Sequence, residues 1–213
     1  MVLQRKVRLL FLFVIVLFIA GCNILSSEQS LLSAFEKLIK YEKEFHKQQK
    51  PLVELEKKEK EIYDRIMSLG MKQFPEILKL SEEALEIIEK REKRIKKEYD
   101  SIQLAKKQLE VVKTEISSLP DQAVKENASR LVQLLEKRYM TYDELYNDYQ
   151  QALQLEIDLY RMFQNKQLTL EQLEQQVIKI NSAYDEIKKA NEQFNRYTVE
   201  YNEAKKALFN TLK

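Results

Sequence analysis

Carboxylates and lysines are the commonest residues in this sequence that could do chemistry, and many of them stand at the spacing of neighbours on a helix surface. Four pairs place Glu four residues before Lys: Glu54–Lys58, Glu56–Lys60, Glu89–Lys93 and Glu92–Lys96. Each such pair stabilises a helix by about 0.2–0.5 kcal/mol. A catalytic carboxylate pair also needs a pocket that shifts its pKa values, and no pattern marks one. We therefore expect a protein that is not an enzyme.

Several kinds of site are excluded by composition. The 213 residues include two Gly, three Pro, one Cys, one His and no Trp. Gly21 and Gly70 cannot form a phosphate-binding or dinucleotide-binding loop. One Cys and one His cannot provide a structural zinc site or a disulfide framework. We expect no metal and no cofactor, and we interpret His46, which follows Phe45 near a predicted core row, as structural.

A dense basic segment runs from Lys90 to Lys97, with six basic residues among eight. Lys93, Lys96 and Lys97 in this segment are candidates for contact with an anionic polymer such as teichoic acid or with lipid head groups. The alternative is an ordinary solvated helix face. Residues 1–21 contain three basic and no acidic residues, and the remainder of the chain has 33 basic and 34 acidic residues. Nucleic-acid binding requires a basic surplus, so we expect no nucleic-acid partner.

Tyrosine is the commonest aromatic residue, with eleven in the chain. Tyr139, Tyr142, Tyr146 and Tyr149 share one face of a predicted helix. Tyr142 and Tyr149 fall on its core row, whereas Tyr139 and Tyr146 flank that row and are predicted to be half-exposed. Exposed rings could stack on sugars or on a partner's side chains. Tyr139 and Tyr146 are therefore candidates for contact with the sugars of a cell wall or with a protein partner. The alternative is packing at the edge of the core.

The N-terminus has the pattern of an export signal. Three basic residues within 5–8 precede twelve apolar residues over 9–20. As a helix, that run would span about 18 Å, which is short for a hydrocarbon core of about 30 Å. The sequence Ile19-Ala20-Gly21-Cys22 follows and resembles the lipobox of bacterial lipoproteins. The resemblance implies cleavage before Cys22, a diacylglycerol thioether on its sulfur, and attachment to the membrane through the lipid.

The rest of the chain has the heptad-like apolar spacing of helices packed on helices. Four segments of about 40 residues are separated by breaks near Gly70, Pro120 and Lys166. We expect Gly70 to adopt the left-handed conformation at a helix end and Pro75 to lie in the first turn of the next helix. The break at 117–121 offers a Ser cap, with Pro120 at an early helical position. Short connections make successive helices antiparallel.

The helical pattern predicts two further local features, a helix cap and an irregularity at a proline. Thr169 and Gln172 fit a capping box for the fourth helix. Pro51 interrupts the first helix without changing the phase of its apolar row, so a kink or a short break is expected there. The predicted core rows also contain polar residues, which cost stability and can fix helix register. The alternative is a buried functional ion site. These residues are Gln48, Glu59, Arg91, Glu98, Arg138, Glu156 and Asn191.

Five stretches are spread through most of the chain: Gln48–Leu52, Leu69–Lys72, Leu80–Ala84, Tyr142–Tyr146 and Leu168–Glu171. In these stretches and in their order, the chain resembles the YkyA-like family of cell-wall-binding lipoproteins from Bacillus-type bacteria. The resemblance implies an exported, lipid-anchored helical protein on the outer face of the membrane. It supplies no catalytic or binding residues.

These observations predict an all-α protein, an elongated antiparallel bundle of about four long helices with coiled-coil character. Residues 1–21 form the lipoprotein signal peptide, 22–27 the lipidated Cys and a short tether, and 28–213 the bundle. The expected function is that of a non-enzymatic, lipid-anchored envelope protein of a Gram-positive bacterium, which contacts peptidoglycan or teichoic acid. The alternative is a coiled-coil adaptor that docks a membrane or secreted protein partner.

Overall fold

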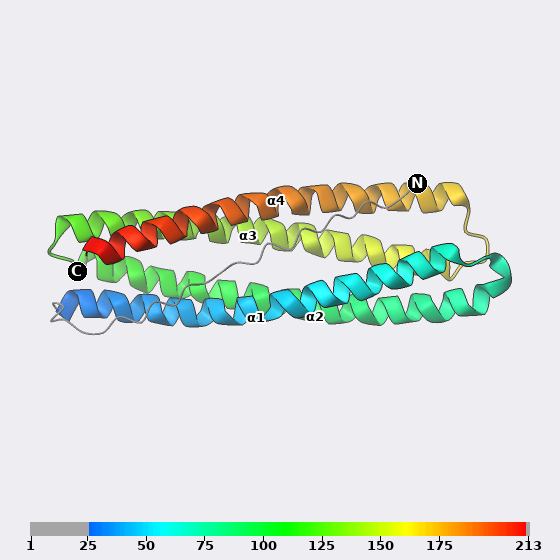
Figure 1. The fold of residues 1–213 in the computed structure, drawn as a ribbon, viewed down its shortest axis with the longest axis horizontal. Helices are drawn as coiled ribbons and strands as arrows, with labels where there is room; N and C mark the ends of the chain where they lie inside the picture. The colour runs from blue at the N-terminus through cyan, green and yellow to red at the C-terminus, as the bar shows by residue number, and fades with distance from the viewer. Residues whose placement is uncertain (1–25, 212–213) are drawn as a thin grey trace.

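The computed structural model describes residues 26–211, which form an elongated bundle of four long helices (Figure 1). The helices are α1 (Ser26–Ser68), α2 (Phe74–Ser117), α3 (Gln122–Phe163) and α4 (Leu170–Thr211), and a short 3-10 turn, η1 (Met71–Gln73), precedes α2. Helices of 42–44 residues are about 65 Å long. The predicted all-α architecture and its three reversals are confirmed. The predicted signal peptide and lipobox, including Cys22, lie outside the described residues.

The first reversal differs in detail from the prediction. Gly70 does not have a positive φ, so the predicted left-handed conformation is wrong. The chain instead enters η1 directly, where the Gln73 N–H donates to the Gly70 carbonyl at 2.8 Å. A 3-10 turn needs no left-handed residue. Pro75 lies in the first turn of α2, as predicted.

The other two reversals are fixed by side-chain caps. Asp121 caps α3, because its carboxylate accepts a hydrogen bond of 2.9 Å from the Val124 N–H. Pro120 therefore precedes the helix, and the predicted Ser cap is wrong because Asp121 occupies that role. Thr169 and Gln172 form the predicted capping box of α4, with reciprocal side-chain to backbone bonds of 3.1 and 3.2 Å.

The first helix is longer and more continuous than predicted. It begins at Ser26, inside the range predicted as a tether, and its first turn includes Glu28, whose negative charge is favourable at a helix N-terminus. It continues through Pro51 without a break, so of the predicted kink or short break the break is wrong, and the kink stays a prediction. The apolar row on both sides of Pro51 is buried against the bundle, with Leu52 and Phe45 in the core, and this packing offsets the missing backbone bond.

Two helical hairpins form the bundle, and the α1–α2 pair packs against the α3–α4 pair through α2 and α3. No Cα atom of α1 lies within 8 Å of one of α4 in the described chain. Long side chains fill this wider seam, for example Phe45 and Phe194, whose ring centroids are 5.8 Å apart. In Figure 1, the start of α1, the α2–α3 turn and the end of α4 lie at one end of the rod.

The core runs along the whole bundle as two clusters of apolar residues. One cluster surrounds Leu38, Ile102 and Leu135 toward the end where α1 begins. The other surrounds Ile62, Ile88 and Leu159 toward the opposite end. Most of the predicted core rows are therefore buried. Between and within these clusters lie the buried polar side chains that form the first candidate site.

Candidate functional site

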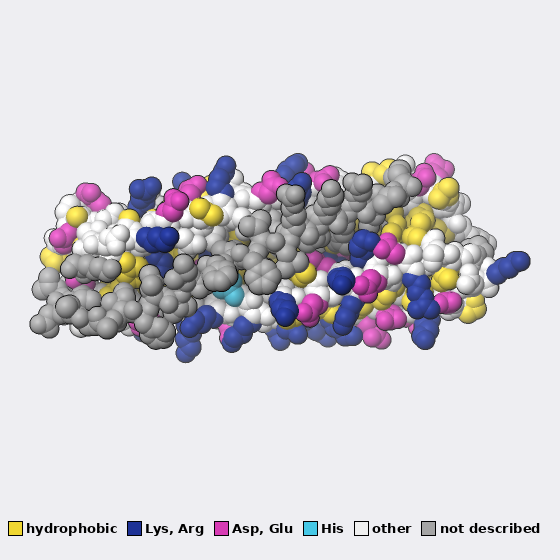
Figure 2. Space-filling model, in the orientation of Figure 1, with side chains coloured by type: hydrophobic (Ala, Val, Ile, Leu, Met, Phe, Trp, Pro, Cys, Tyr) yellow, Lys and Arg dark blue, Asp and Glu magenta, His cyan; other side chains and the backbone are white. Residues whose placement is uncertain are grey.

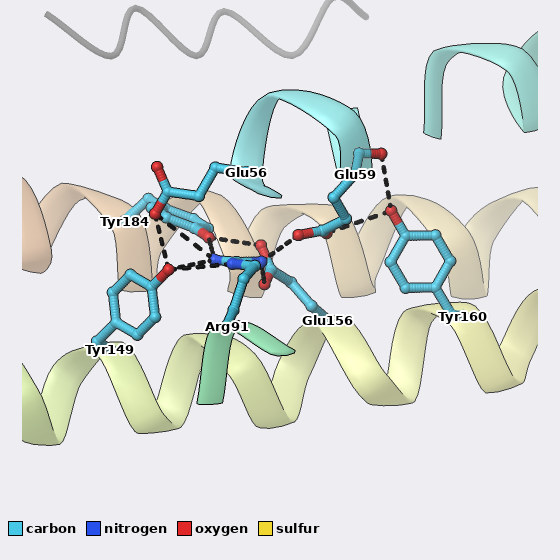
Figure 3. A network of polar contacts seen from close by, with 7 residues as sticks. All are labelled: Glu56, Glu59, Arg91, Tyr149, Glu156, Tyr160 and Tyr184. Atoms are coloured by element: carbon cyan, nitrogen blue, oxygen red, sulfur yellow. Dashed lines mark hydrogen bonds and ion pairs between the residues drawn. The ribbon is translucent and has the colours of Figure 1, made fainter. Parts of the chain in front are cut away.

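A buried arginine joins all four helices in the half of the bundle that holds the second core cluster (Figure 3). Arg91 of α2 has no exposed surface. Its Nη1 donates to Glu156 of α3 at 2.6 Å and also to Glu59 of α1. Its Nη2 donates to the hydroxyl groups of Tyr149 in α3 at 2.9 Å and Tyr184 in α4 at 2.8 Å. The guanidinium group thus connects every helix through charge-assisted hydrogen bonds.

Two tyrosines complete this Arg91 cluster by donating to its carboxylates. The Tyr149 hydroxyl donates to Glu56 at 2.7 Å, and the Tyr184 hydroxyl donates to Glu156 at 2.6 Å. Glu56 also lies 3.8 Å from the guanidinium group. Burial alone would lower the pKa of Arg91, but the neighbouring Glu156, Tyr149 and Glu59 outweigh burial and hold that pKa well above its usual value. Arg91 is therefore a permanent cation.

One heptad away from Arg91, Glu98 of α2 is buried without an ion-pair partner among the described residues. Its carboxyl group accepts hydrogen bonds from Tyr142 of α3 at 2.9 Å and from Gln49 of α1 at 2.7 Å. Burial raises the pKa of Glu98 to about 8, although these two hydrogen bonds act in the opposite direction. Glu98 therefore holds its proton to a higher pH than an exposed carboxyl group does.

A second buried arginine, Arg138 of α3, lies in the half of the bundle where α1 begins. It pairs with Glu42 of α1 and donates to the hydroxyl of Thr198 in α4 at 2.9 Å. The ring of Phe194 lies 4.6 Å from its guanidinium carbon, a cation–π arrangement. Tyr139 donates to the same Glu42 at 2.7 Å. This cluster holds one arginine and one carboxylate, so its charge is balanced.

These clusters form polar layers that join the helices. Six of the seven predicted polar core positions are buried as predicted, whereas Asn191 is exposed. The cavity beside the Arg91 cluster has a volume of about 20 Å³, enough for a water molecule.

Within residues 26–211, no group of His, Cys, Asp and Glu side chains could hold a metal ion. His46 is half-buried beside Phe45, and burial lowers its pKa.

The second candidate site is a basic surface formed jointly by α1 and α2. Over residues 36–53 and 90–107, ten lysines but only four acidic residues are exposed. Figure 2 shows Lys and Arg side chains along the lower edge of the rod, over α1 and α2. We name this surface the α1–α2 lysine face and define it by its lysines: Lys37, Lys40, Lys43, Lys47, Lys50, Lys90, Lys93, Lys96, Lys97 and Lys107.

The predicted candidates Lys93, Lys96 and Lys97 all belong to this lysine face, but they are only part of it. Sequence reasoning missed the contribution of α1, whose Lys40, Lys43, Lys47 and Lys50 recur with spacings of three and four residues. That spacing was available in the sequence. What the sequence did not provide was the neighbour, because only the packing of α1 on α2 places the two sets of lysines side by side.

The predicted ion pairs are only partly correct. Lys93 pairs with Glu89 as predicted, whereas Lys96 pairs with Asp100 and not with Glu92. Lys60 likewise pairs with Asp64, because its predicted partner Glu56 turns inward to the Arg91 cluster. The fourth predicted pair, Glu54–Lys58, is also absent from the ion pairs of the described residues. For Glu56, the buried hydrogen-bond partner Tyr149 thus replaces the solvent-exposed Lys60.

The predicted pair of half-exposed tyrosines is not a pair in the structure. Tyr139 is 1% exposed, so the prediction that it offers a ring to a glycan or a partner is wrong. It is buried because α3 is flanked by both α2 and α4, which leaves little open surface beside its core row. Tyr146 is half-buried, and its ring stacks on Tyr99 of α2 with centroids 4.1 Å apart.

Together, these features define a rod-shaped helical protein with polar clusters in its apolar core and a lysine-rich flank. The chain matches the model of the family described as "Putative cell-wall binding lipoprotein", YkyA, over residues 26–211, and it belongs to this family. It is 37% identical over 193 residues to "Uncharacterized lipoprotein YkyA" of Bacillus subtilis (strain 168), covering 91% of this chain and 86% of the relative.

A solved structure supports the fold independently. The chain is similar to the 1.6 Å crystal structure of a conserved protein of unknown function from Staphylococcus aureus, with a TM-score of 0.68. The match covers 86% of this chain and 93% of the other, at 15% sequence identity. That likeness concerns the fold alone. Family membership makes the chain a lipoprotein of the cell envelope, and none of the described helices is long and apolar enough to cross a membrane.

Proposed function

We propose that this protein is a non-enzymatic lipoprotein on the outer face of the cytoplasmic membrane of a Gram-positive bacterium, where it binds the cell wall. The observation that carries the proposal is the α1–α2 lysine face, a concentrated positive surface on a chain whose overall charge is nearly balanced. The family description supports the same role. The proposed lipid on Cys22 provides attachment to the membrane.

The geometry of the rod suits a link between membrane and wall. Helix α1 begins at Ser26, so residues 22–25 form the whole connection from the proposed lipidated cysteine. Four residues span at most about 14 Å, and the bundle therefore starts close to the bilayer. A rod about 65 Å long then carries the lysine face away from the membrane and into the space occupied by wall material.

The interior of the bundle supports a binding role over a catalytic one. Its titratable side chains are engaged with one another across helices, and nearly all of its buried polar side-chain atoms have partners among the described residues. Arg91, Glu98 and Arg138 thus hold the helices in register. A catalytic acid or base has to reach substrate, and these groups face the core.

Sedimentation with purified cell walls tests the proposal. Full-length mature protein in mild detergent should pellet with walls and remain soluble without them. An unrelated lipoprotein in the same detergent controls for binding through the lipid. In cells, the protein should also be protected from an external protease until the wall is digested. If the purified protein stays in the supernatant at every wall concentration, the proposed wall binding is incorrect.

A second candidate function is that of a coiled-coil adaptor, and one observation favours it. Ile178 and Val199 of α4 are 49% and 58% exposed and stand three heptads apart on the helix. Large apolar side chains exposed along one helix are typical of contacts with another helix. Photo-crosslinking from position 199 in living cells should trap a discrete protein partner if the adaptor role is correct. Position 186, which is exposed on a different side of α4, is the control.

A further inference from the structure

We infer that the α1–α2 lysine face binds the linear phosphodiester polymers of the wall, the teichoic-acid class, in preference to peptidoglycan. This inference rests on the proposed function and names its ligand. The relevant chemistry is that of a flexible chain carrying one negative charge per repeat. Such a chain is bound by arrays of exposed cations that displace its counterions.

The first support is that many lysines of this face have no acidic partner. Lys37, Lys40, Lys43, Lys50, Lys97 and Lys107 are exposed and form no ion pair with any described residue. The lysines that are paired on this surface have partners within their own helix, and such exposed pairs contribute little energy. The face therefore carries uncompensated positive charge that an external polyanion can neutralise.

The second support is the linear arrangement of these charges. Lys40, Lys43, Lys47 and Lys50 follow the outer side of α1 with spacings of three, four and three residues, and this row extends about 15 Å along the helix axis. Lys90, Lys93 and Lys97 form a similar row on α2, which packs beside α1. Two adjacent rows of cations along a rod match a linear polyanion lying parallel to that rod.

The composition of the face argues against an uncharged glycan. Carbohydrate recognition commonly uses accessible aromatic rings, but the aromatic residues beside these lysines are already engaged. Tyr99 is stacked on Tyr146, and Phe45 is buried in the core. The groups that remain accessible on the face are mainly ammonium groups, which recognise phosphate by charge.

The face is also poorly suited to a membrane surface. Helices that lie in the membrane interface bury a broad apolar side among lipid head groups. Of the large apolar side chains exposed in the described chain, only Leu104 falls within residues 36–53 and 90–107. Lys37 and Lys50 lie about 16 and 36 Å along α1 from its start at Ser26, so an upright rod holds the face away from the bilayer.

Matched lysine variants test the inference. The face variant combines Lys40→Gln, Lys43→Gln, Lys50→Gln and Lys97→Gln, which removes four unpaired charges. The control variant combines Lys179→Gln, Lys188→Gln, Lys189→Gln and Lys206→Gln, which removes four exposed charges from α4. Both are prepared as full-length mature protein, and circular dichroism establishes that each retains the helical fold. Each is then sedimented with intact walls and with walls chemically stripped of their phosphodiester polymers.

Wild-type protein should bind intact walls, and its affinity for stripped walls should be at least about tenfold lower. Its affinity for intact walls should fall steeply with salt. The affinity of the face variant for intact walls should be at least about tenfold lower than that of wild type, with a shallower salt dependence. The control variant should resemble wild type. Equal wild-type binding to intact and stripped walls would overturn the phosphodiester assignment while preserving wall binding. Equal binding by the face and control variants would overturn the assigned surface.

Vesicles containing anionic phospholipid complete the test. Purified soluble polymer should compete wild-type protein off intact walls, and the vesicles should compete much less effectively. If the vesicles compete as well as the polymer, the surface is a lipid-binding one and the inference is overturned. Absence of binding to every wall preparation would instead contradict the proposed function itself.

Discussion

Glu98 of α2 and Tyr142 of α3 share a buried hydrogen bond of 2.9 Å, and no lysine or arginine pairs with the Glu98 carboxyl group within the described chain. The pKa of Glu98 rises from its ordinary value of 4.5 to about 8, chiefly through burial. Between these two pH values, the folded protein retains a proton that the unfolded chain has released. The free energy of unfolding must therefore fall as the pH rises through this window.

We predict that Glu98→Gln flattens this pH dependence. The amide imitates the protonated carboxyl group, because its oxygen can accept one of the two hydrogen bonds and its NH₂ group can donate in the other, to the Tyr142 hydroxyl oxygen or to the Gln49 side-chain oxygen. The variant should therefore be more stable than wild type at pH 8. Wild-type stability should fall by up to about 1.4 kcal/mol per pH unit between pH 5 and 8. Urea unfolding across this range provides the measurement, and the exposed Glu92→Gln is the control. Parallel wild-type and Glu98→Gln curves would show that Glu98 does not hold the proton.

Arg91 should be the most sensitive polar residue in the bundle. Arg91→Met removes the cation that Glu59 and Glu156 share, and it leaves buried carboxylates without their ion pair. Breaking a buried pair in this way costs about 3–5 kcal/mol. Combining Arg91→Met with Glu59→Gln and Glu156→Gln should restore part of the loss, because the uncompensated charges are removed as well.

Equilibrium urea unfolding of both variants tests this prediction. Arg138→Met is the comparison, since it strands only Glu42 and should cost less than Arg91→Met. If Arg91→Met leaves the unfolding midpoint unchanged, the Arg91 cluster contributes nothing to stability. If the triple variant is no more stable than Arg91→Met alone, stranded charge is not the cause of the loss.

The fold could be predicted from sequence because its signals are local. The apolar rows at helical spacing gave four helices, and Pro75 and the Thr169–Gln172 box stand where the structure has helix ends. Gly70 shows the limit of such signals. A glycine after a helix permits a left-handed residue, but the η1 turn that follows makes that conformation unnecessary.

The sites were harder to predict because they depend on contacts between helices. Glu56 stands four residues before Lys60, and this spacing predicts an ion pair between them. In the folded bundle, Glu56 instead lies against Arg91 of α2 and Tyr149 of α3. Asn191 is predicted to be buried but is exposed, whereas Tyr139 is predicted to be half-exposed but is buried. Which flank of a helix is covered depends on how many neighbours it has, and the heptad pattern of one helix does not determine that number.

Tyr139 and Tyr146 should respond differently to mutation. Tyr139→Ala removes a ring that is 1% exposed and a hydroxyl bonded to Glu42, so we expect a loss of about 3–5 kcal/mol in stability. Tyr146→Ala removes a half-buried ring and its stacking on Tyr99, and should cost less. Thermal and urea unfolding provide the comparison. Equal losses would indicate that the exposure of Tyr146 has no energetic consequence.

The final prediction concerns the membrane anchor at Cys22, in the sequence Ile19-Ala20-Gly21-Cys22. If the sulfur carries diacylglycerol, Cys22→Ala should either release the protein from the membrane or leave an uncleaved precursor. The acyl chains provide the anchoring energy, at about 0.8 kcal/mol for each buried CH₂ group. The matched control is Asn23→Ala, which alters the next residue and should remain attached to the membrane.

Membrane fractionation and mass spectrometry of the N-terminal peptide distinguish the outcomes. Wild type and Asn23→Ala should yield a peptide that begins at Cys22 and carries the mass of the lipid. If Cys22→Ala is still cleaved after Gly21 and remains with the membrane until detergent is added, the lipid on Cys22 cannot be the anchor. The attachment would then have to come from the folded bundle, and the exposed lysines of α1 and α2 would be the first surface to test.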